Sequence, residues 1–354
     1  MPAALATVAA VGEAFPPHYY GQEELLAALR SHWAEAHHNL ERLASLHRNV
    51  LVGGRHLALP LEAYAGLDDF GKANDAWIAV AQDVGAQAMR RGLERAGVGL
   101  EEVAALYTVT VTGIATPSLD ARLVNRLGLR PSLKRVPIFG LGCVAGAAGV
   151  ARAADYLHAY PDQVAVLLSV ELCSLTLQRR DLSVPNLIAS GLFGDGAAAV
   201  VLAGRDRGLP GPRVVATRSV FYPDSERVMG WDVTSSGFRI VLSAEVPEVV
   251  ARHLRHDVEA FLAEHGLSRR DIAVWAAHPG GPKVLQAMEE ALELHDGELE
   301  AAWRSLREVG NLSSTSVLLV LQEALARPGV PRGAWGMMVA MGPGFCSELV
   351  LLQW

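Results

Sequence analysis

Cysteine is scarce in this sequence of 354 residues, and its spacing excludes two common uses of the residue. The three cysteines, Cys143, Cys173 and Cys346, are odd in number and include no C-x-x-C pair. A disulfide framework uses an even set of cysteines, and a zinc site uses closely spaced ligands. We therefore expect free thiols in a reducing compartment and no metal site.

Long apolar segments and basic clusters are also missing. No window reaches the roughly 18 apolar residues that span a bilayer, and the opening stretch MPAALATVAAVGEAF lacks the positive charges of a signal peptide. The net charge is −7, without the cluster of cations that binds phosphate backbones. The sequence thus predicts a cytoplasmic protein with an opening strand, no integral membrane segment and no nucleic-acid partner.

What the sequence does contain is a mixed α/β pattern. Hydrophobic residues make up 51% and charged residues 19%, as in a globular chain with a large core. Short apolar runs at 163–171, 196–204 and 335–344 indicate strands buried on both faces of a sheet, which helices must then cover. The spacing of apolar residues predicts helices at 73–98 and 244–266.

A cluster of Gly, Pro and Arg at residues 203–213 separates two strand-like runs. We place a boundary there, so that the chain divides into halves 1–209 and 210–354. Each half has the same strand and helix character, although no short-period repeat is visible.

Cys143 stands in an unusual setting, the stretch PIFGLGCVAGAAGVARAADYL. The residues before it indicate a strand and a turn, and those after it a helix, which places the thiol at a helix N-terminus. Partial positive charge at that position favours the thiolate, so Cys143 is a candidate nucleophile. The glycines around it allow close backbone approach. A structural core cysteine is the alternative interpretation.

A nucleophilic cysteine needs a base or an ion-pair partner, and His278 is the best candidate. It follows a strand-like run and precedes Pro-Gly-Gly, a turn that brings backbone close to another group. Asn311, in GNLSSTSV, is the third candidate. Taken alone, His278 could be a satisfied core histidine and Asn311 a turn or N-cap residue.

Five stretches together carry a family resemblance: GLGCVAGAAG, LFGDGAAAVVL, HPGGPKVL, GNLSSTSV and MGPGF. In this order and spacing the chain resembles the type III polyketide synthases, the chalcone synthase-like branch of the thiolase superfamily, over nearly its whole length. FGDGAAAV also occurs in ketoacyl synthases, whereas HPGGP and the late GPG are typical of the type III branch. The resemblance implies a five-layered αβαβα fold of two similar halves, with the nucleophile in 1–209 and the catalytic His and Asn in 210–354.

The resemblance also implies roles for individual residues. The family's catalytic triad corresponds to Cys143, His278 and Asn311, and its gatekeeper phenylalanine to Phe193. Plant members have a second phenylalanine where this chain has Ile240, and tend to have methionine where it has Thr116. The loop 112–123 around Thr116 is similar to one that crosses the dimer interface, so we expect a homodimer. By family position, the substrate cavity is lined by Thr116, Cys173, Thr176, Phe193 and Ile240, with Arg55 facing the CoA phosphates and the backbone of Gly280, Gly281 and Pro282 along the pantetheine arm.

The activity that follows is iterative condensation of CoA thioesters. An acyl-CoA starter is loaded on Cys143, malonyl-CoA is decarboxylated, and the growing chain cyclises; both thioesters are substrates, and no cofactor is expected. Aliphatic and small residues at Ile240 and Thr116 favour a fatty acyl starter and an alkylpyrone or alkylresorcinol product. The close alternative is a tetrahydroxynaphthalene synthase primed by malonyl-CoA itself.

Two further alternatives are less favoured. A ketoacyl-ACP synthase III usually has its histidine in a His-Gln-Ala-Asn setting, which HPGG is not. A non-catalytic thiolase-fold binding protein would be expected to lose the triad, yet Cys143, His278 and Asn311 are all present.

Overall fold

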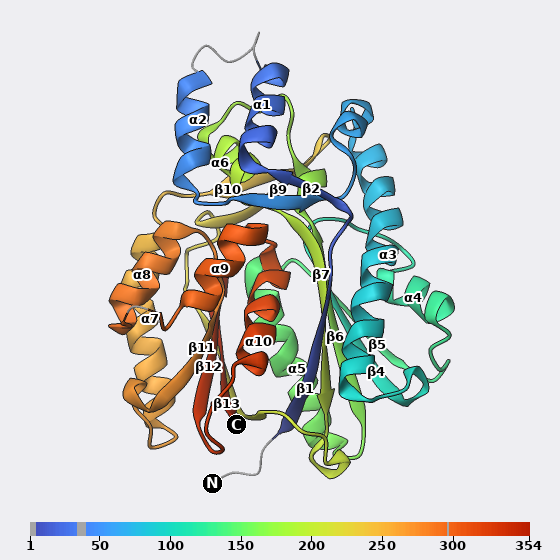
Figure 1. Ribbon diagram of the computed structural model, residues 1–354, viewed down its shortest axis with the longest axis vertical. Helices are drawn as coiled ribbons and strands as arrows, with labels where there is room; N and C mark the ends of the chain where they lie inside the picture. The colour runs from blue at the N-terminus through green and yellow to red at the C-terminus, as the bar shows by residue number, and fades with distance from the viewer. Residues whose placement is uncertain (1–4, 34–39, 296) are drawn as a thin grey trace.

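The computed structural model describes residues 5–33, 40–295 and 297–354, so the first four residues of the predicted opening strand lie outside it. A nine-stranded sheet has the order β11-β12-β13-β8-β1-β7-β6-β4-β5 (Figure 1). The predicted apolar runs are indeed strands, and every residue of β6 and β7 is buried. The strands are β1 (Ala6–Ala14), β4 (Val103–Thr110), β5 (Lys134–Phe139), β6 (Val164–Leu172), β7 (Asp195–Ala203), β8 (Arg213–Phe221), β11 (Ile272–Ala277), β12 (Trp335–Gly342) and β13 (Cys346–Gln353).

The two ends of this sheet repeat one pattern. In the first part β4 and β6 are parallel, and β7 and then β1 follow antiparallel. In the second part β11 and β12 are parallel, and β13 and then β8 follow antiparallel. The parts join where β1 meets β8, at Ala6 with Val214 and Thr7 with Arg213. The second copy of the pattern begins with β8 at Arg213, and the division of the chain between residues 209 and 210 stays a prediction.

Helices form the remaining layers. α5 (Ala145–Ala159) and α10 (Ser316–Ala326) lie between the two parts of the sheet, while α3 (Phe70–Ala96) and α4 (Leu119–Leu127) cover one outer side and α7 (Val246–Ala263) and α8 (Pro282–Leu292) the other (Figure 1). The central pair is closely packed, because a Cβ on Gly146 of α5 would lie 2.6 Å from Cγ1 of Val317 in α10. This arrangement confirms the five-layered thiolase-like fold. α9 (Glu300–Val309) packs beside α10.

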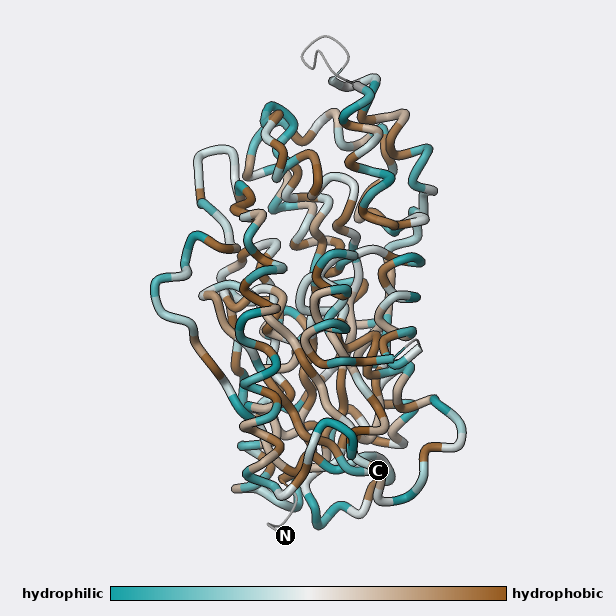
Figure 2. Tube along the Cα trace, turned by 90° about the vertical axis from the view of Figure 1, so that its left-hand side faces the viewer, coloured by the Kyte–Doolittle hydropathy of each residue, from teal (hydrophilic) through white to brown (hydrophobic). Residues whose placement is uncertain are grey.

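A cap covers one end of these layers. It consists of α1 (Gln22–Trp33), α2 (Leu40–Asn49) and α6 (Val184–Leu192), with the hairpins β2 (His18–Gly21) with β3 (Gly54–Leu57) and β9 (Met229–Thr234) with β10 (Gly237–Leu242). A small apolar cluster holds the three helices together, formed by Leu26, Trp33, Leu43, Ala44 and Leu187. Figure 2 shows that hydrophobic segments concentrate in the strands and inner helices.

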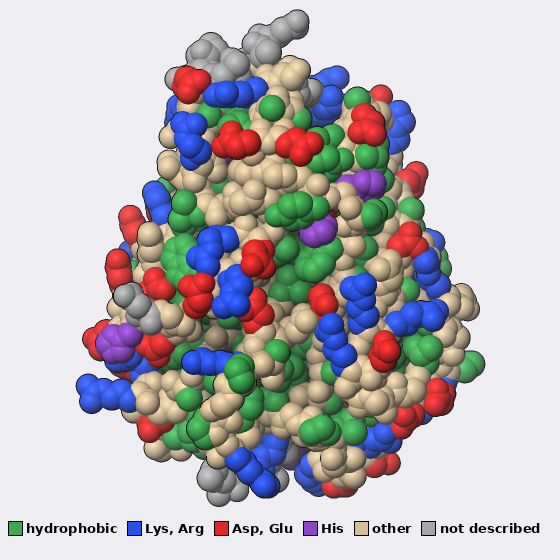
Figure 3. Space-filling model, in the orientation of Figure 1, with side chains coloured by type: hydrophobic (Ala, Val, Ile, Leu, Met, Phe, Trp, Pro, Cys, Tyr) green, Lys and Arg blue, Asp and Glu red, His purple; other side chains and the backbone are tan. Residues whose placement is uncertain are grey.

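Charged side chains of both signs lie among exposed hydrophobic ones on the face of the molecule drawn in Figure 3. On this face, cationic and anionic side chains are interspersed over the outer helices. The part of the chain that the structure describes contains no helix long and apolar enough to span a bilayer. All three cysteines are free thiols, as expected.

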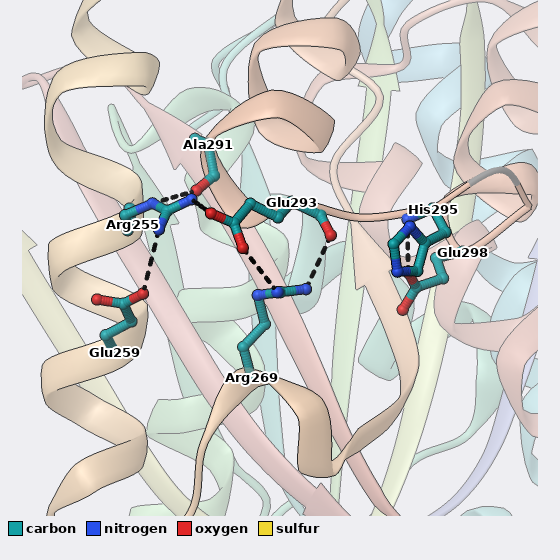
Figure 4. A network of polar contacts seen from close by, with 7 residues as sticks. All are labelled: Arg255, Glu259, Arg269, Ala291, Glu293, His295 and Glu298. Carbon is teal, nitrogen blue, oxygen red and sulfur yellow. Dashed lines mark hydrogen bonds and ion pairs between the residues drawn. The ribbon is translucent and has the colours of Figure 1, made fainter.

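Ion pairs fasten the outer helices on one side (Figure 4). Arg255 of α7 donates from Nε to the Ala291 carbonyl at 2.9 Å, and Arg269 donates to the Glu293 carbonyl at 2.8 Å and to its carboxylate at 3.0 Å. Both arginines thus hold the C-terminal end of α8. This network belongs to the outer layer, so its residues provide controls for variants in the centre.

Candidate active site

Cys143 lies where β5 turns into α5, as the sequence predicts. It belongs to a short 3-10 turn, η3 (Gly142–Val144), and its side chain is buried. The preceding Gly142 has φ +55°, and a Cβ there would lie 2.7 Å from the Pro343 ring. Glycine is therefore required in front of the thiol, both for backbone conformation and for the close approach of the GPG loop.

Gly142→Ala is expected to destabilise the protein by about 1 to 3 kcal/mol more than a matched control, because the new methyl group overfills this contact. The control is Gly208→Ala, which has a similar φ of +66° but no heavy atom within 4 Å of the added Cβ. Urea denaturation of both variants measures the difference. Equal free energies of unfolding would show that the Pro343 contact does not constrain residue 142.

Burial dominates the electrostatics of Cys143 and His278. Burial raises the pKa of the Cys143 thiol to about 12. A contact of its Sγ with Ser313 Oγ at 3.7 Å lowers the same pKa, but by less. Burial also lowers the pKa of His278 to about 4. The resting site therefore favours a neutral thiol and a neutral imidazole, rather than the thiolate and imidazolium that the helix N-terminus suggests from sequence.

His278 follows β11 directly, and its backbone N–H donates to the Val339 carbonyl of β12 at 2.8 Å. The side chain is 2% exposed. Among the described residues, neither of its ring nitrogens has a hydrogen-bond partner. Because a buried polar group without a partner is costly, such an imidazole is suited to a group that arrives with the substrate.

Asn311 connects three parts of the site. Its Nδ2 donates to the Gly280 carbonyl, two residues after His278, at 3.1 Å. Its Oδ1 accepts from the backbone N–H of Ser313, the residue that contacts Cys143, at 2.8 Å. Its backbone pairs with the segment of the predicted gatekeeper: Asn311 N–H donates to the Leu192 carbonyl at 2.9 Å, and Gly194 N–H donates to the Asn311 carbonyl at 3.0 Å. These contacts bring the surroundings of all three predicted catalytic residues together.

Two adjoining cavities lie at the site, and the smaller of them reaches Cys143. The inner pocket has a volume of about 40 Å³ and includes Cys143 and Ser313 in its wall. The outer cavity, of about 300 Å³, extends from there to the face of α1. Four residues line both: Cys173, Phe193, Trp231 and Ile240. The structure thus places Cys173, Phe193 and Ile240 in the predicted cavity wall, and Thr176 in the wall of the outer cavity.

Thr116 does not line either cavity of its own chain. It is exposed in the loop before α4. The expectation that it lines the pocket is therefore not met within one chain.

Arg55 also differs from the expectation. Its side chain is 3% exposed, and its guanidinium donates to the carbonyls of Ser190 and Gly191 and to Gln22 Oε1. Because these acceptors already occupy it inside the protein, it does not offer a free cation to the phosphates of CoA. Gly280 has a structural contact with Asn311, while the predicted role of Gly280, Gly281 and Pro282 toward the pantetheine arm stays a prediction.

Sequence reasoning missed three residues at the site. Trp231 on β9 lies opposite Ile240 on β10, and the alternation around the turn in MGWDVTSSGF is the signal for this hairpin. Ser313 contacts Cys143. Glu171 is buried on β6, where it accepts hydrogen bonds from Val111 N–H at 3.0 Å and from Ser314. Burial raises its pKa to about 7. The available signal was a single carboxylate in a strand of mostly apolar residues.

Comparison with known proteins agrees with this geometry. Residues 2–206 match the family of chalcone and stilbene synthases, N-terminal domain, and residues 213–354 match the C-terminal domain of the same family. A 1,3,6,8-tetrahydroxynaphthalene synthase of Streptomyces peucetius subsp. caesius is 53% identical over 98% of this chain and 93% of that protein. A putative chalcone synthase of Bacillus subtilis is 37% identical over 99% of each chain.

Among solved structures, a 1,3,6,8-tetrahydroxynaphthalene synthase from Streptomyces coelicolor A3(2), described as a bacterial type III polyketide synthase, superimposes with a TM-score of 0.94. It is 32% identical and covers 99% of both chains. The chain therefore belongs to the chalcone and stilbene synthase family and is a type III polyketide synthase, an acyltransferase that condenses malonyl-CoA with a CoA thioester.

Proposed function

We propose that this enzyme is primed by malonyl-CoA and produces 1,3,6,8-tetrahydroxynaphthalene. The observation that carries the proposal is the size of the inner pocket, about 40 Å³, which Trp231 helps to close beside Cys143. A small starter fits such a pocket better than a fatty acyl chain. The 53% identity to a tetrahydroxynaphthalene synthase supports the same conclusion. The proposal therefore prefers the malonyl-primed tetrahydroxynaphthalene synthase, which the sequence analysis gave as the alternative, to a synthase with a fatty acyl starter.

Loading begins when Cys143 Sγ attacks the thioester carbonyl of the starter. Because burial favours the neutral thiol, the Sγ proton has to leave as the new C–S bond forms, and the unpartnered imidazole of His278 is the acceptor that we assign. The C–S bond to CoA then breaks, and the CoA sulfur takes the proton from His278. The starter is now a thioester of Cys143, and the imidazole is again neutral.

Extension requires a second malonyl-CoA to lose carbon dioxide. The electron pair of the broken C–C bond moves onto the thioester as an enolate, whose oxygen needs hydrogen-bond donors. We assign His278 and Asn311 to this role. The Asn311 amide has two N–H groups, and the Gly280 carbonyl uses one, so the second is available. The enolate carbon then attacks the Cys143 thioester and displaces the thiolate.

The chain is expected to work as a homodimer without a cofactor. Support for the dimer comes from the exposed loop of Thr116 and from two exposed apolar side chains nearby, Ile114 at 45% and Phe139 at 50% exposure. Light scattering of the purified protein measures the mass in solution.

Thiol, imidazole and amide supply every proton and hydrogen bond in the steps above. The cytoplasmic location stays a prediction from sequence.

The choice of starter is tested with ¹³C-labelled malonyl-CoA, given alone and together with long acyl-CoA thioesters. Chromatography with mass spectrometry identifies the products. We expect fully labelled tetrahydroxynaphthalene from malonyl-CoA alone. Products that appear only when a long acyl-CoA is present, and carry its alkyl chain, would replace this proposal by the alkylpyrone or alkylresorcinol synthase.

Trp231→Ala is expected to widen the inner pocket and raise kcat/KM for starters of six or more carbons at least tenfold relative to malonyl-CoA priming, because removing a large side chain leaves a cavity. Val233→Ala is the matched control, since Val233 lies on the same strand but is 69% exposed. Unchanged starter preference in the Trp231 variant would show that this side chain does not limit the pocket.

A further inference from the structure

Two buried charges lie on either side of the segment that carries Phe193. Arg55 on β3 is 3% exposed, and Asp195 at the start of β7 is fully buried. Ionised side chains are rarely buried without a partner, because removing a charge from water is costly. The catalytic steps above use neither group, so their contacts indicate another role.

Arg55 holds the end of α6. Its guanidinium donates to the carbonyls of Ser190 and Gly191, in the last turn of the helix, and Gln22 Nε2 donates to the Gly191 carbonyl at 2.9 Å. The last carbonyls of a helix lack partners within the helix and carry partial negative charge, which a cation stabilises. α6 ends at Leu192, so this contact fixes the point from which Phe193 projects.

Asp195 holds the other side of Phe193. Its carboxylate accepts from the backbone N–H of Ala58 at 2.5 Å and of Ser174 at 2.8 Å, and also from the Ser174 hydroxyl. Ala58 is three residues beyond Arg55, and Ser174 follows the pocket residue Cys173. Burial lowers the pKa of Arg55 to about 10 and raises that of Asp195 to about 6, and the attraction between the two charges opposes both shifts.

The segment between these two charges is joined to Asn311. The backbone of Leu192 and Gly194 exchanges hydrogen bonds with the backbone of Asn311 on both sides of Phe193, at 2.9 and 3.0 Å. A displacement of the end of α6 therefore moves the Asn311 backbone as well as the Phe193 ring. The Asn311 amide has to be held accurately if it is to donate to an enolate oxygen.

We propose that Arg55 and Asp195 form a buried clamp that positions Asn311 and Phe193 for decarboxylation of malonyl-CoA. Both are positioning residues: Arg55 borders the outer cavity, but the two charges act through the backbone of residues 190–195 rather than on the reacting atoms. The inference rests on the enolate-binding role proposed for Asn311. It also assigns Arg55 a function that is different from binding the phosphates of CoA.

The test compares Arg55→Met and Arg55→Lys with the parent enzyme in malonyl-CoA decarboxylation. We expect kcat to fall at least tenfold in Arg55→Met and less in Arg55→Lys, which keeps the charge but cannot span both carbonyls. The rate of Cys143 alkylation by iodoacetamide should stay within twofold of the parent, since the thiol is not held by the clamp. Relative to the parent, the affinity of Arg55→Met for CoA and its affinity for dephospho-CoA should change by the same small factor, as measured by calorimetry.

Arg255→Met is the matched control, because Arg255 also donates to a carbonyl near a helix C-terminus, but on the outer layer (Figure 4). It should keep the parent kcat. Two results overturn the clamp: an unchanged kcat in Arg55→Met, or a loss of affinity for CoA that spares dephospho-CoA, which would return Arg55 to phosphate binding.

Two further measurements cover the remaining cases. If Arg55→Met does not fold, Asp195→Asn has to show the same loss of kcat with normal alkylation, and a parental kcat overturns the proposal. If the parent enzyme itself does not decarboxylate malonyl-CoA, the proposed function fails, and the clamp is judged by hydrogen exchange. Faster exchange in peptides covering 190–195 and 310–314 of Arg55→Met supports the clamp, and unchanged exchange overturns it.

Discussion

Cys143→Ala is expected to abolish polyketide formation, with a loss of at least about 10³-fold in turnover, because the variant has no group on which the chain can grow. We do not expect Cys173, in the same inner pocket, to take over, because among the described residues the Ser313 contact that partly offsets the raised pKa of Cys143 is made to Cys143 and not to Cys173. Burial, together with the nearby negative charges of Glu171 and Asp195, raises the pKa of its thiol well above the ordinary value. Product formation from labelled malonyl-CoA measures the effect, and mass spectrometry of the intact protein shows whether an acyl adduct forms.

The control for this variant is Cys346→Ala. Cys346 is partly exposed at the start of β13, and its Sγ contacts the Pro343 carbonyl at 3.2 Å. We expect this variant to keep turnover and to acquire one acyl adduct. Extended polyketide from Cys143→Ala, with an adduct on either remaining cysteine, would contradict the assignment of the nucleophile.

Asn311→Ala is expected to lower malonyl-CoA decarboxylation by roughly 10²- to 10³-fold, the usual cost of removing one donor to a developing oxyanion. The backbone pairing of residue 311 with Leu192 and Gly194 does not involve the side chain, so Phe193 should keep its place. Cys143 should still be acylated by a starter thioester. The measurement is the release of carbon dioxide, run beside single-turnover acylation of the protein.

The exposed Asn125 of α4 provides a control for the Asn311 variant, because its replacement by alanine removes an amide far from the centre. Decarboxylation at the parental rate in Asn311→Ala would remove this amide from the enolate site. Loss of acylation together with decarboxylation would instead show that Asn311 supports the thiol itself.

Much of the fold could be predicted because the pattern is local. A nearly unbroken apolar run such as VAVLLSVEL is typical of a strand buried on both faces, and β6 is buried throughout. The turn before Cys143 could be recognised from its glycines and from the residues after it, which carry no charge at the start of the helix. This pattern is typical of a turn that leads into a buried helix. The helix predicted at 244–266 followed from its apolar spacing; it spans Val246–Ala263, and Val250, Leu254 and Val258 lie on its buried face.

The direction of individual side chains was harder to predict, because it depends on elements distant in sequence. Arg55 points inward since the last turn of α6, some 135 residues later, supplies its acceptors. Trp231 reaches the pocket only through the register of a hairpin that pairs it with Ile240. Thr116 is exposed in the loop before α4 and lies in neither cavity wall. Pocket volume, and with it the starter, is set by such non-local packing.

The position of β1 has a consequence for synthesis of the chain on the ribosome. This strand pairs with β7 and β8, so Thr7 must find both Ala203 and Arg213. A nascent chain therefore exposes β1 without partners until about 200 further residues have been translated. Long-range strand pairing of this kind is slow and leaves edges open to aggregation. Translation speed and chaperones should thus influence the yield of active enzyme more than the stability of the finished fold does.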